Sequence, residues 1–184
     1  MGNLKPNQNV PVLWEVIRET AAANEEFASN FHLNFTGNAD DSVVESVQQQ
    51  QLQEMLTRKG YVPHKEATAI MHRTNLLLFI VPQCENNHLI LTGKLFEYIA
   101  TGRPMLAIGP VNGNAAKLIS NAGRDKMIDY KDKEMMKEQL LNNFQRWKEE
   151  GQKLHQLPSS NIQQYSRKAQ TQKLSEILNQ MVEK

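Results

Sequence analysis

Residues 89–110, "LILTGKLFEYIATGRPMLAIGP", carry the clearest succession of structural signals in this chain. Apolar residues recur at helical spacing from Leu95 to Ile99, and Gly102 follows them as a stop signal. The run after Pro104 is continuously apolar, which is typical of a strand covered on both faces. The stretch therefore predicts the end of a strand, a turn, a helix and then a buried parallel strand.

Segments of the same two kinds alternate along the rest of the chain, joined by short turns. We expect strands at 31–37, 61–63, 75–82, 104–109 and 126–130, and helices at 9–27, 41–60, 64–74, 114–123, 131–151 and 161–184. Right-handed crossovers between parallel strands place helices on both faces of a sheet. The sequence thus predicts a Rossmann-like, doubly wound α/β domain, whose ligands bind at the carboxyl ends of the strands.

The composition is that of an ordinary globular protein, and it argues against several classes. The formal net charge of +1 at pH 7 argues against a large nucleic-acid-binding surface. Cys84 is the single cysteine, so the sequence holds no disulfide framework. No apolar run is long enough to span a bilayer. We therefore expect a cytoplasmic protein with no transmembrane segment and no nucleic-acid partner.

The start of the helix within residues 89–110 is a candidate anion site. Thr92 stands in the capping position, which leaves the first N–H groups of the helix, from Gly93 onward, facing outward at its positive end. Lys94 and Glu97 share one side of this helix, so a carboxylate that could hold a sugar diol lies one turn from the phosphate position. Alternatively, Thr92 is simply a cap, and the two charges form a surface ion pair worth about 0.5 kcal/mol or less.

Two further features have an ordinary structural explanation beside a functional one. Gly113 and Asn114 begin another predicted helix at a strand end, so they could donate to a sugar or phosphate, or simply form a turn and a cap. His64 and His72 are far apart, and no pair of carboxylates stands at ligand spacing from them. We therefore expect no metal site.

The order of these motifs resembles the C-terminal half of GT-B fold glycosyltransferases. The likeness is carried by three segments, "GYVPHKEATAIMHRTNLLLFIVP" (60–82), "TGKLFEYIATGRPMLAIGP" (92–110) and "GNAAKLISNAG" (113–123). It is greatest to bacterial members similar to glycosyltransferase family 4, and it runs from about residue 2 to the end of the chain. The resemblance implies a nucleotide-sugar-binding domain over residues 1–160 and a helix over 161–184 that returns toward an N-terminal acceptor domain.

The same resemblance implies roles for individual residues. Glu97 would hold the ribose hydroxyls, and the turn Thr92–Lys94 would face the diphosphate. Val62 and Pro63 would lie along the nucleotide base, which the family contacts largely through main-chain groups. The donor-binding residues expected are Lys5, Val62, Pro63, Thr92, Gly93, Lys94, Glu97, Gly113 and Asn114.

The sequence departs from the family pattern at two places. Leu89 stands where the family often has the first of two glutamates that contact the donor sugar. Asn3 and Gln8 stand where an arginine and a lysine often bind the diphosphate, although Lys5 is close enough to substitute. These departures bear on the identity of the donor and on catalysis more than on the fold.

The activity implied by the resemblance is transfer of a sugar from a nucleotide diphosphate donor to an acceptor, with the nucleotide sugar as substrate and no cofactor. The family has a central strand before the opening glycine turn and an acceptor-binding domain before that strand. Residues 1–184 contain neither, so we expect a chain that binds without turnover and carries no assignable catalytic residue. The missing strand predicts a gap in the sheet or a strand borrowed from a second copy, and hence a homo-oligomer. Two alternatives remain: a nucleotide-sugar epimerase-type domain and a non-catalytic Rossmann-like binding module.

Overall fold

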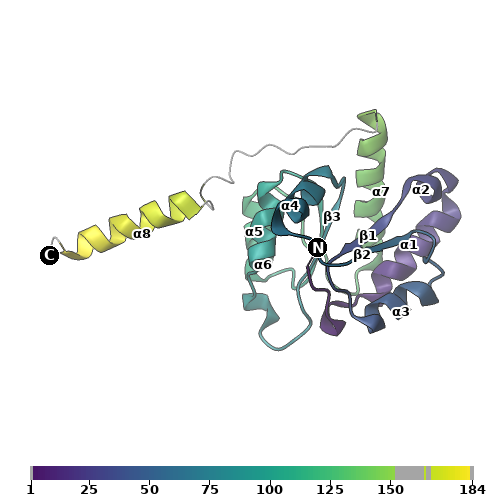
Figure 1. Ribbon diagram of the computed structural model, residues 1–184, viewed down its shortest axis with the longest axis horizontal. Coiled ribbons are helices and arrows are strands. Elements are labelled where there is room, and N and C mark those ends of the chain that lie inside the picture. The colour runs from purple at the N-terminus through teal and green to yellow at the C-terminus, as the bar shows by residue number, and fades with distance from the viewer. Residues whose placement is uncertain (1, 152–163, 165–166, 183–184) are drawn as a thin grey trace.

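The computed structural model describes residues 2–151, 164 and 167–182, in which helices alternate with short parallel strands (Figure 1). The α/β class expected from the sequence is confirmed. In chain order the elements are η1 (Pro6–Gln8), α1 (Pro11–Ala23), α2 (Glu25–Asn30), β1 (Leu33–Thr36), α3 (Asp41–Gln49), β2 (Leu56–Lys59), α4 (His64–Arg73), β3 (Leu77–Ile80), η2 (Asn87–Leu89), α5 (Gly93–Ala100), β4 (Met105–Ile108), α6 (Asn114–Asn121), α7 (Lys133–Glu149) and α8 (Arg167–Val182).

The strands of the described residues form two separate parallel pairs and no continuous sheet. Strand β1 pairs with β2, and β3 pairs with β4, each over four residues. Helices pack on both faces of the β3–β4 pair, as the continuously apolar sequences of these strands predict. The arrangement is a Rossmann-like fold with an incomplete sheet, so the predicted gap is present.

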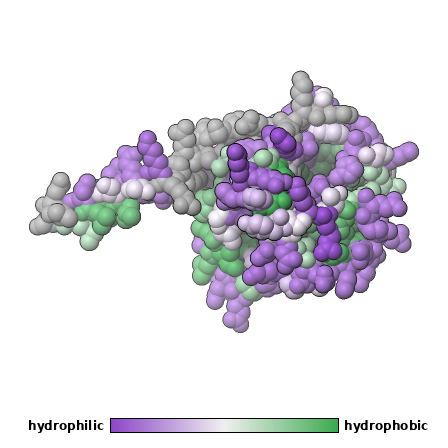
Figure 2. Space-filling view, in the orientation of Figure 1, coloured by the Kyte–Doolittle hydropathy of each residue, from purple (hydrophilic) through white to green (hydrophobic). Residues whose placement is uncertain are grey.

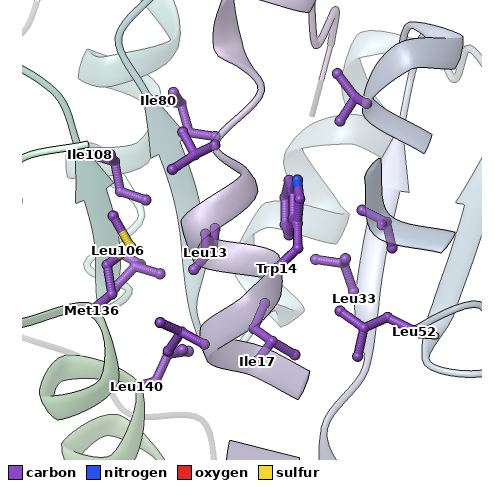
Figure 3. Packing of buried hydrophobic residues seen from close by; sticks show 14 of the residues in the cluster. Leu13, Trp14, Ile17, Leu33, Leu52, Ile80, Leu106, Ile108, Met136 and Leu140 are labelled. Atoms are coloured by element: carbon purple, nitrogen blue, oxygen red, sulfur yellow. The ribbon is translucent and has the colours of Figure 1, made fainter. Parts of the chain in front are cut away.

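Helix α1 packs against both strand pairs. Its side chains Leu13 and Trp14 are fully buried, and in Figure 3 they lie between Ile80 of β3 and Leu33 of β1. All four residues belong to one hydrophobic cluster, which also includes Met136 of α7. The two pairs are therefore held together by helix packing and not by a shared ladder of hydrogen bonds.

The beginning of α1 differs from the start expected at Asn9. The helix begins at Pro11, where proline's fixed φ and missing N–H suit the first position. The Asn9 side chain instead accepts a hydrogen bond from the buried Trp14 indole, with Oδ1 2.8 Å from Nε1. Asn9 thus fixes the tryptophan that faces β1.

A second hydrophobic cluster covers the other face of β3 and β4. It consists of apolar side chains from both strands together with those of α5 and α6, among them Leu95, Ile99 and Ile119. All four residues of β4 are buried. The stretch 89–110 therefore folds as its sequence predicts, with a helix packed onto the strand that follows it.

The helix expected over 41–60 is shorter in the structure, and a strand occupies its second part. Helix α3 ends at Gln49, and Gln51 has a φ of 59°, in the left-handed region that ends helices. The chain then forms β2, before the strand expected at 61–63. Three of the four β2 side chains are exposed, so the strand lacks the alternation that identifies strands in a sequence.

Two other elements also differ from expectation. The helix expected over 9–27 is interrupted at Asn24, whose side chain caps α2 by accepting from the main-chain N–H of Phe27 at 2.9 Å. The strand expected at 126–130 contributes only an isolated parallel bridge between Ile108 and Ile128.

Helix α8 lies apart from the rest of the described chain in Figure 1. Its exposed apolar side chains are Leu174, Ile177, Leu178 and Met181, and Figure 2 shows them on one side of the helix. The boundary expected after residue 160 lies outside the described residues, and the return of this helix toward another domain stays a prediction. None of the described helices combines the length and apolar character needed to cross a membrane.

Candidate functional site

A cavity of about 290 Å³ opens where β1 and β2 end and α5 begins. It is lined by Gly2, Thr36, Gly37, Tyr61, Val62, His64, Ala67, Met71, Lys94, Glu97 and Tyr98. The carboxyl ends of parallel strands are the usual place for ligands in doubly wound folds. The cavity therefore lies where the sequence predicts a site, and it includes the predicted residues Val62, Lys94 and Glu97.

Two glycines bring main chain against main chain at this cavity. Gly37 has a φ of +104°, and a Cβ added to it would lie 2.4 Å from the carbonyl oxygen of Gly2. The N–H of Gly2 donates to the carbonyl of Thr36 at 2.8 Å. Because no side chain fits into this contact, the N-terminal segment lies directly on the end of β1.

Lys94 supplies the positive charge of the cavity. Its aliphatic chain packs on Gly2, whose added Cβ would lie 3.6 Å from Cε of Lys94. Burial lowers the pKa of the Lys94 amine, while the negative charge of Glu97 acts in the opposite direction. None of the ion pairs between described residues joins Lys94 to Glu97, so the surface ion pair considered from the sequence is not formed.

The first turn of α5 has unused hydrogen-bonding groups. Thr92 stands at the N-cap but does not cap with its side chain, and its buried Oγ1 has no hydrogen-bond partner in the described part of the chain. The N–H of Leu95 donates to the Thr92 carbonyl at 3.1 Å. A Cβ on Gly93 would meet no atom within 4 Å. The start of the helix is therefore open to an anion at Gly93, next to the Lys94 side chain.

Helix α5 contributes one buried and one exposed side chain to the lining of the cavity. Tyr98 is 2% exposed, and its burial raises the pKa of its hydroxyl well above the ordinary range. Glu97, one residue earlier, is exposed and lines the same cavity. A carboxylate that remains in contact with water can exchange water molecules for the hydroxyls of a sugar at little cost in desolvation.

The opposite lining comes from residues between Tyr61 and Met71, which follow β2 and extend along most of α4. Tyr61 is 91% exposed, and Val62 beside it is buried. His64, Ala67 and Met71 follow at the spacing that places residues on one face of a helix. This segment offers an aromatic side chain and an apolar surface to the cavity. Such a surface can pack against a flat ring.

The remaining predicted residues lie around the cavity or elsewhere. Pro63 is exposed at the N-cap of α4, next to the lining residue Val62. Lys5 is exposed at the start of η1, where its main-chain N–H donates to Oε1 of Gln8 at 3.2 Å. Lys5 does not line the cavity, so its binding role stays a prediction.

The turn at Gly113 and Asn114 packs against η2. A Cβ on Gly113 would lie 3.0 Å from the carbonyl oxygen of His88. The Asn114 side chain donates to the carbonyl of Leu89 at 3.5 Å. The structure therefore gives this turn a packing contact and does not bring it to the cavity of Lys94, and its ligand role remains a prediction.

Several lining residues could not be chosen from the sequence. Tyr98 belongs to the apolar face of α5, which alone indicates a core position. Thr36 is the last residue of a short strand, and its position gave no particular signal. Ala67 and Met71 share the face of α4 that begins with His64, and this helical spacing is the one signal that could have identified them.

No protein-family model matches this sequence, and no curated protein matches it significantly. Within residues 2–151, 164 and 167–182, no group of three or more His, Cys, Asp and Glu side chains is arranged to hold a metal ion. The titratable side chains that line the cavity are Lys94, Glu97, His64 and the two tyrosines Tyr61 and Tyr98. The open start of α5 lies next to Lys94.

Proposed function

We propose that this chain is the donor-binding domain of a glycosyltransferase and that the cavity at Lys94 takes a nucleoside diphosphate sugar. The observation that carries the proposal is the meeting of two separate segments around one cavity. One segment supplies Lys94 and Glu97 from α5, and the other supplies Val62 from the connection between β2 and α4. A cation, a diol acceptor and an apolar wall are the three elements that such a ligand needs.

In this proposal the diphosphate lies between the start of α5 and the N-terminal segment. The Lys94 amine and the N–H of Gly93 would bind its oxygens, and the absence of any atom within 4 Å of a Cβ on Gly93 leaves room for them. When the bond between the sugar and the diphosphate breaks, the bonding electrons pass to the diphosphate. Lys94 and the helix dipole would stabilise this developing charge.

The ribose and base follow from the remaining lining. The two carboxylate oxygens of Glu97 can accept hydrogen bonds from two neighbouring hydroxyls, which makes Glu97 a binding residue and not the general base. The base would lie along Val62, with Tyr61 and His64 at its edges. Groups that bind the acceptor would come from another domain, so this chain is expected to bind a donor without turning it over.

The test is calorimetric titration of the chain with UDP, GDP and ADP, beside the variants Glu97→Ala and Glu45→Ala. Glu45 is an exposed carboxylate on α3, away from the cavity lining, and serves as the matched control. We expect one nucleotide to bind, Glu97→Ala to weaken it about tenfold, and Glu45→Ala to leave it unchanged. Unchanged binding in Glu97→Ala would remove the ribose role, and no binding of any nucleotide to the unaltered chain would overturn the proposal.

A further inference from the structure

The side chain of Lys94 is half-buried, and no carboxylate holds its amine. None of the ion pairs between described residues includes Lys94, whereas Lys59, Lys133 and Lys148 are each paired with one or two glutamates. A neighbouring carboxylate keeps a lysine protonated, and a protonated amine has no lone pair with which to react. Lys94 is therefore a candidate nucleophile, a property that the proposed function does not use.

The Lys94 amine has open space beside it. Lys94 lines the ligand cavity and also a second cavity, of about 380 Å³, which is bordered by β1 and β3. Gly2 brings no side chain to this point, and a Cβ added to it would lie 3.7 Å from Nζ of Lys94. A longer side chain at residue 2 would cover the amine. The glycine therefore leaves the amine accessible to a small electrophile.

The groups around the amine favour its uncharged form. Val62, Met71 and Tyr98 line the ligand cavity together with Lys94. Burial lowers the pKa of the Lys94 amine, and the negative charge of Glu97 opposes this effect. A larger fraction of Lys94 is thus uncharged near neutral pH than of an exposed lysine, and the uncharged amine is the reactive form.

The two residues before Lys94 offer groups that suit a phosphate. Gly93 is the first residue of α5, so its N–H has no partner within the helix. A Cβ on Gly93 would meet no atom within 4 Å, so this N–H is open to a ligand. The fully buried Oγ1 of Thr92 has no hydrogen-bond partner in the described part of the chain. An open N–H, an unused hydroxyl and the positive end of the helix therefore stand beside a reactive amine.

We propose that Lys94 is a site of N-acylation by small acyl phosphates, such as acetyl phosphate, and that its acylation abolishes anion binding in the ligand cavity. An acyl phosphate combines a phosphate group with an electrophilic carbonyl carbon. The phosphate binds at the start of α5, which brings the carbonyl carbon next to Nζ of Lys94. Holding the two reacting atoms together accelerates their reaction.

The reaction is an acyl transfer in which the acyl phosphate is the only co-reactant. The lone pair of the uncharged Lys94 amine attacks the carbonyl carbon, and a carbon–nitrogen bond forms. The bond from that carbon to the phosphate oxygen then breaks, and its electron pair stays on the phosphate. The start of α5 stabilises this charge, and the surplus proton on the nitrogen passes to water. The products are an amide on Lys94 and inorganic phosphate.

The effect on the ligand cavity follows from the lost charge. Acylation turns the cation of Lys94 into a neutral amide, which attracts an anion much less strongly. A nucleotide bound in the cavity covers the same amine, so modification and nucleotide binding exclude each other. This second clause rests on the proposed function, whereas the acylation site itself does not.

The first measurement is the rate at which acetyl phosphate acetylates each lysine of the folded chain, followed by mass spectrometry of its peptides. Lys94 should react about tenfold or more faster than Lys117, an exposed lysine on α6. The N-hydroxysuccinimide ester of acetic acid delivers the same acyl group without a phosphate. Its preference for Lys94 over Lys117 should be about threefold or more smaller. Equal rates at the two lysines with acetyl phosphate, or equal preferences with both reagents, would overturn the proposal.

The second measurement removes the N–H of Gly93 with the variant Gly93→Pro. Thr92 already has the extended backbone that a following proline requires, with φ −115° and ψ 151°, and proline suits the first position of a helix. The variant should slow the reaction of Lys94 with acetyl phosphate about threefold or more and leave its reaction with the ester unchanged. Asn114→Pro, at the first position of α6, is the matched control and should change neither rate. An equal effect on both reagents, or no effect on either, would overturn the proposal.

The third measurement separates the modification from the proposed function. The nucleotide that binds the chain should protect Lys94, and the acetylated chain should bind it about tenfold or more weakly. Lys94→Arg keeps the charge and resists acylation, so the same treatment should leave its own affinity unchanged. Equal affinity of the acetylated and untreated chains would overturn the loss of anion binding. Selective acetylation of Lys94 in a chain that binds no nucleotide would overturn the proposed function and leave the acylation site intact.

Discussion

The two strand pairs of this fold differ in how they are buried. Every residue of β4 is buried, and its pair with β3 lies between two hydrophobic clusters. The β1–β2 pair contacts only the first cluster, β2 is mostly exposed, and Asn34 of β1 is exposed as well. The comparison shows that the candidate ligand cavity lies at the end of the less buried pair. Local unfolding of that pair should require less free energy than local unfolding of β3 and β4. Four predictions test this difference.

The largest effect is expected from a truncation in the buried pair. Ile108→Ala, in β4, should lower the free energy of unfolding by about 3 kcal/mol, since its side chain is fully buried. Leu56→Ala, the partner experiment in β2, removes a half-buried side chain and should cost about 1 kcal/mol or less. Urea unfolding of both variants measures the costs. Similar values would show that the two pairs are equally anchored and break the comparison.

At the ligand cavity, Lys94→Met should reduce nucleotide affinity by about 2 kcal/mol, because it removes a cation that binds the phosphates. The same change should raise the midpoint of thermal unfolding at neutral pH, since burial of a charged amine disfavours folding. Calorimetry and thermal scans supply the two readouts, with Lys117→Met, an exposed position on α6, as the control. Loss of both affinity and stability would mean that Lys94 holds the fold together.

A smaller effect is expected where α1 faces the weaker pair. Asn9→Ala leaves the indole N–H of the fully buried Trp14 without its acceptor and should cost about 1 to 2 kcal/mol of unfolding free energy. Asn7→Ala changes an exposed side chain of η1 and should cost almost nothing. Hydrogen exchange should place the loss in β1 more than in β4. A loss spread equally over both pairs would contradict the specific anchoring of β1 by Trp14.

The smallest effect concerns pH. Since burial lowers the pKa of Lys94, its positive charge is lost at a lower pH than that of an exposed lysine. Anion affinity should therefore decrease as the pH rises through this lowered pKa, and the decrease should be absent in Lys94→Met. Titrations between neutral and alkaline pH, with the same nucleotide, give the two curves. Parallel curves for both proteins would assign the pH dependence to another group.

The elements that sequence patterns predicted are those with a strong local signal. Strands β3 and β4 are continuously apolar, and α5 carries a clear apolar face between a capping residue and a glycine. Strand β2 has an exposed Arg58 and Lys59, so nothing in its pattern separates it from the preceding helix. Helix α3 ends where Gln51 adopts a left-handed backbone conformation. Glutamine rarely adopts this conformation, so the sequence did not predict the helix end there.

The residues of the candidate site also fall into two groups, those that the sequence could identify and those that it could not. Lys94 and Glu97 could be identified because they share one side of a single helix, and their positions relative to each other are fixed by local geometry. Gly2 and Thr36 meet them only through tertiary packing, which no periodicity encodes. The turn at Gly113 has equally good helix-start chemistry, yet it is occupied by contacts with η2. Local chemistry thus identifies candidate groups, whereas their assembly depends on which strand ends lie together.

The contact between Gly37 and Gly2 has a consequence for how the sequence can vary. Gly37 is only half-buried, and substitutions at half-buried loop positions usually have small effects. Here even a methyl group would lie 2.4 Å from a carbonyl oxygen, at a φ of +104°. A saturation scan should therefore find position 37 intolerant of alanine and of every larger residue. The residue allowed at position 37 is thereby limited by the main chain at Gly2, which lies far from position 37 in the sequence.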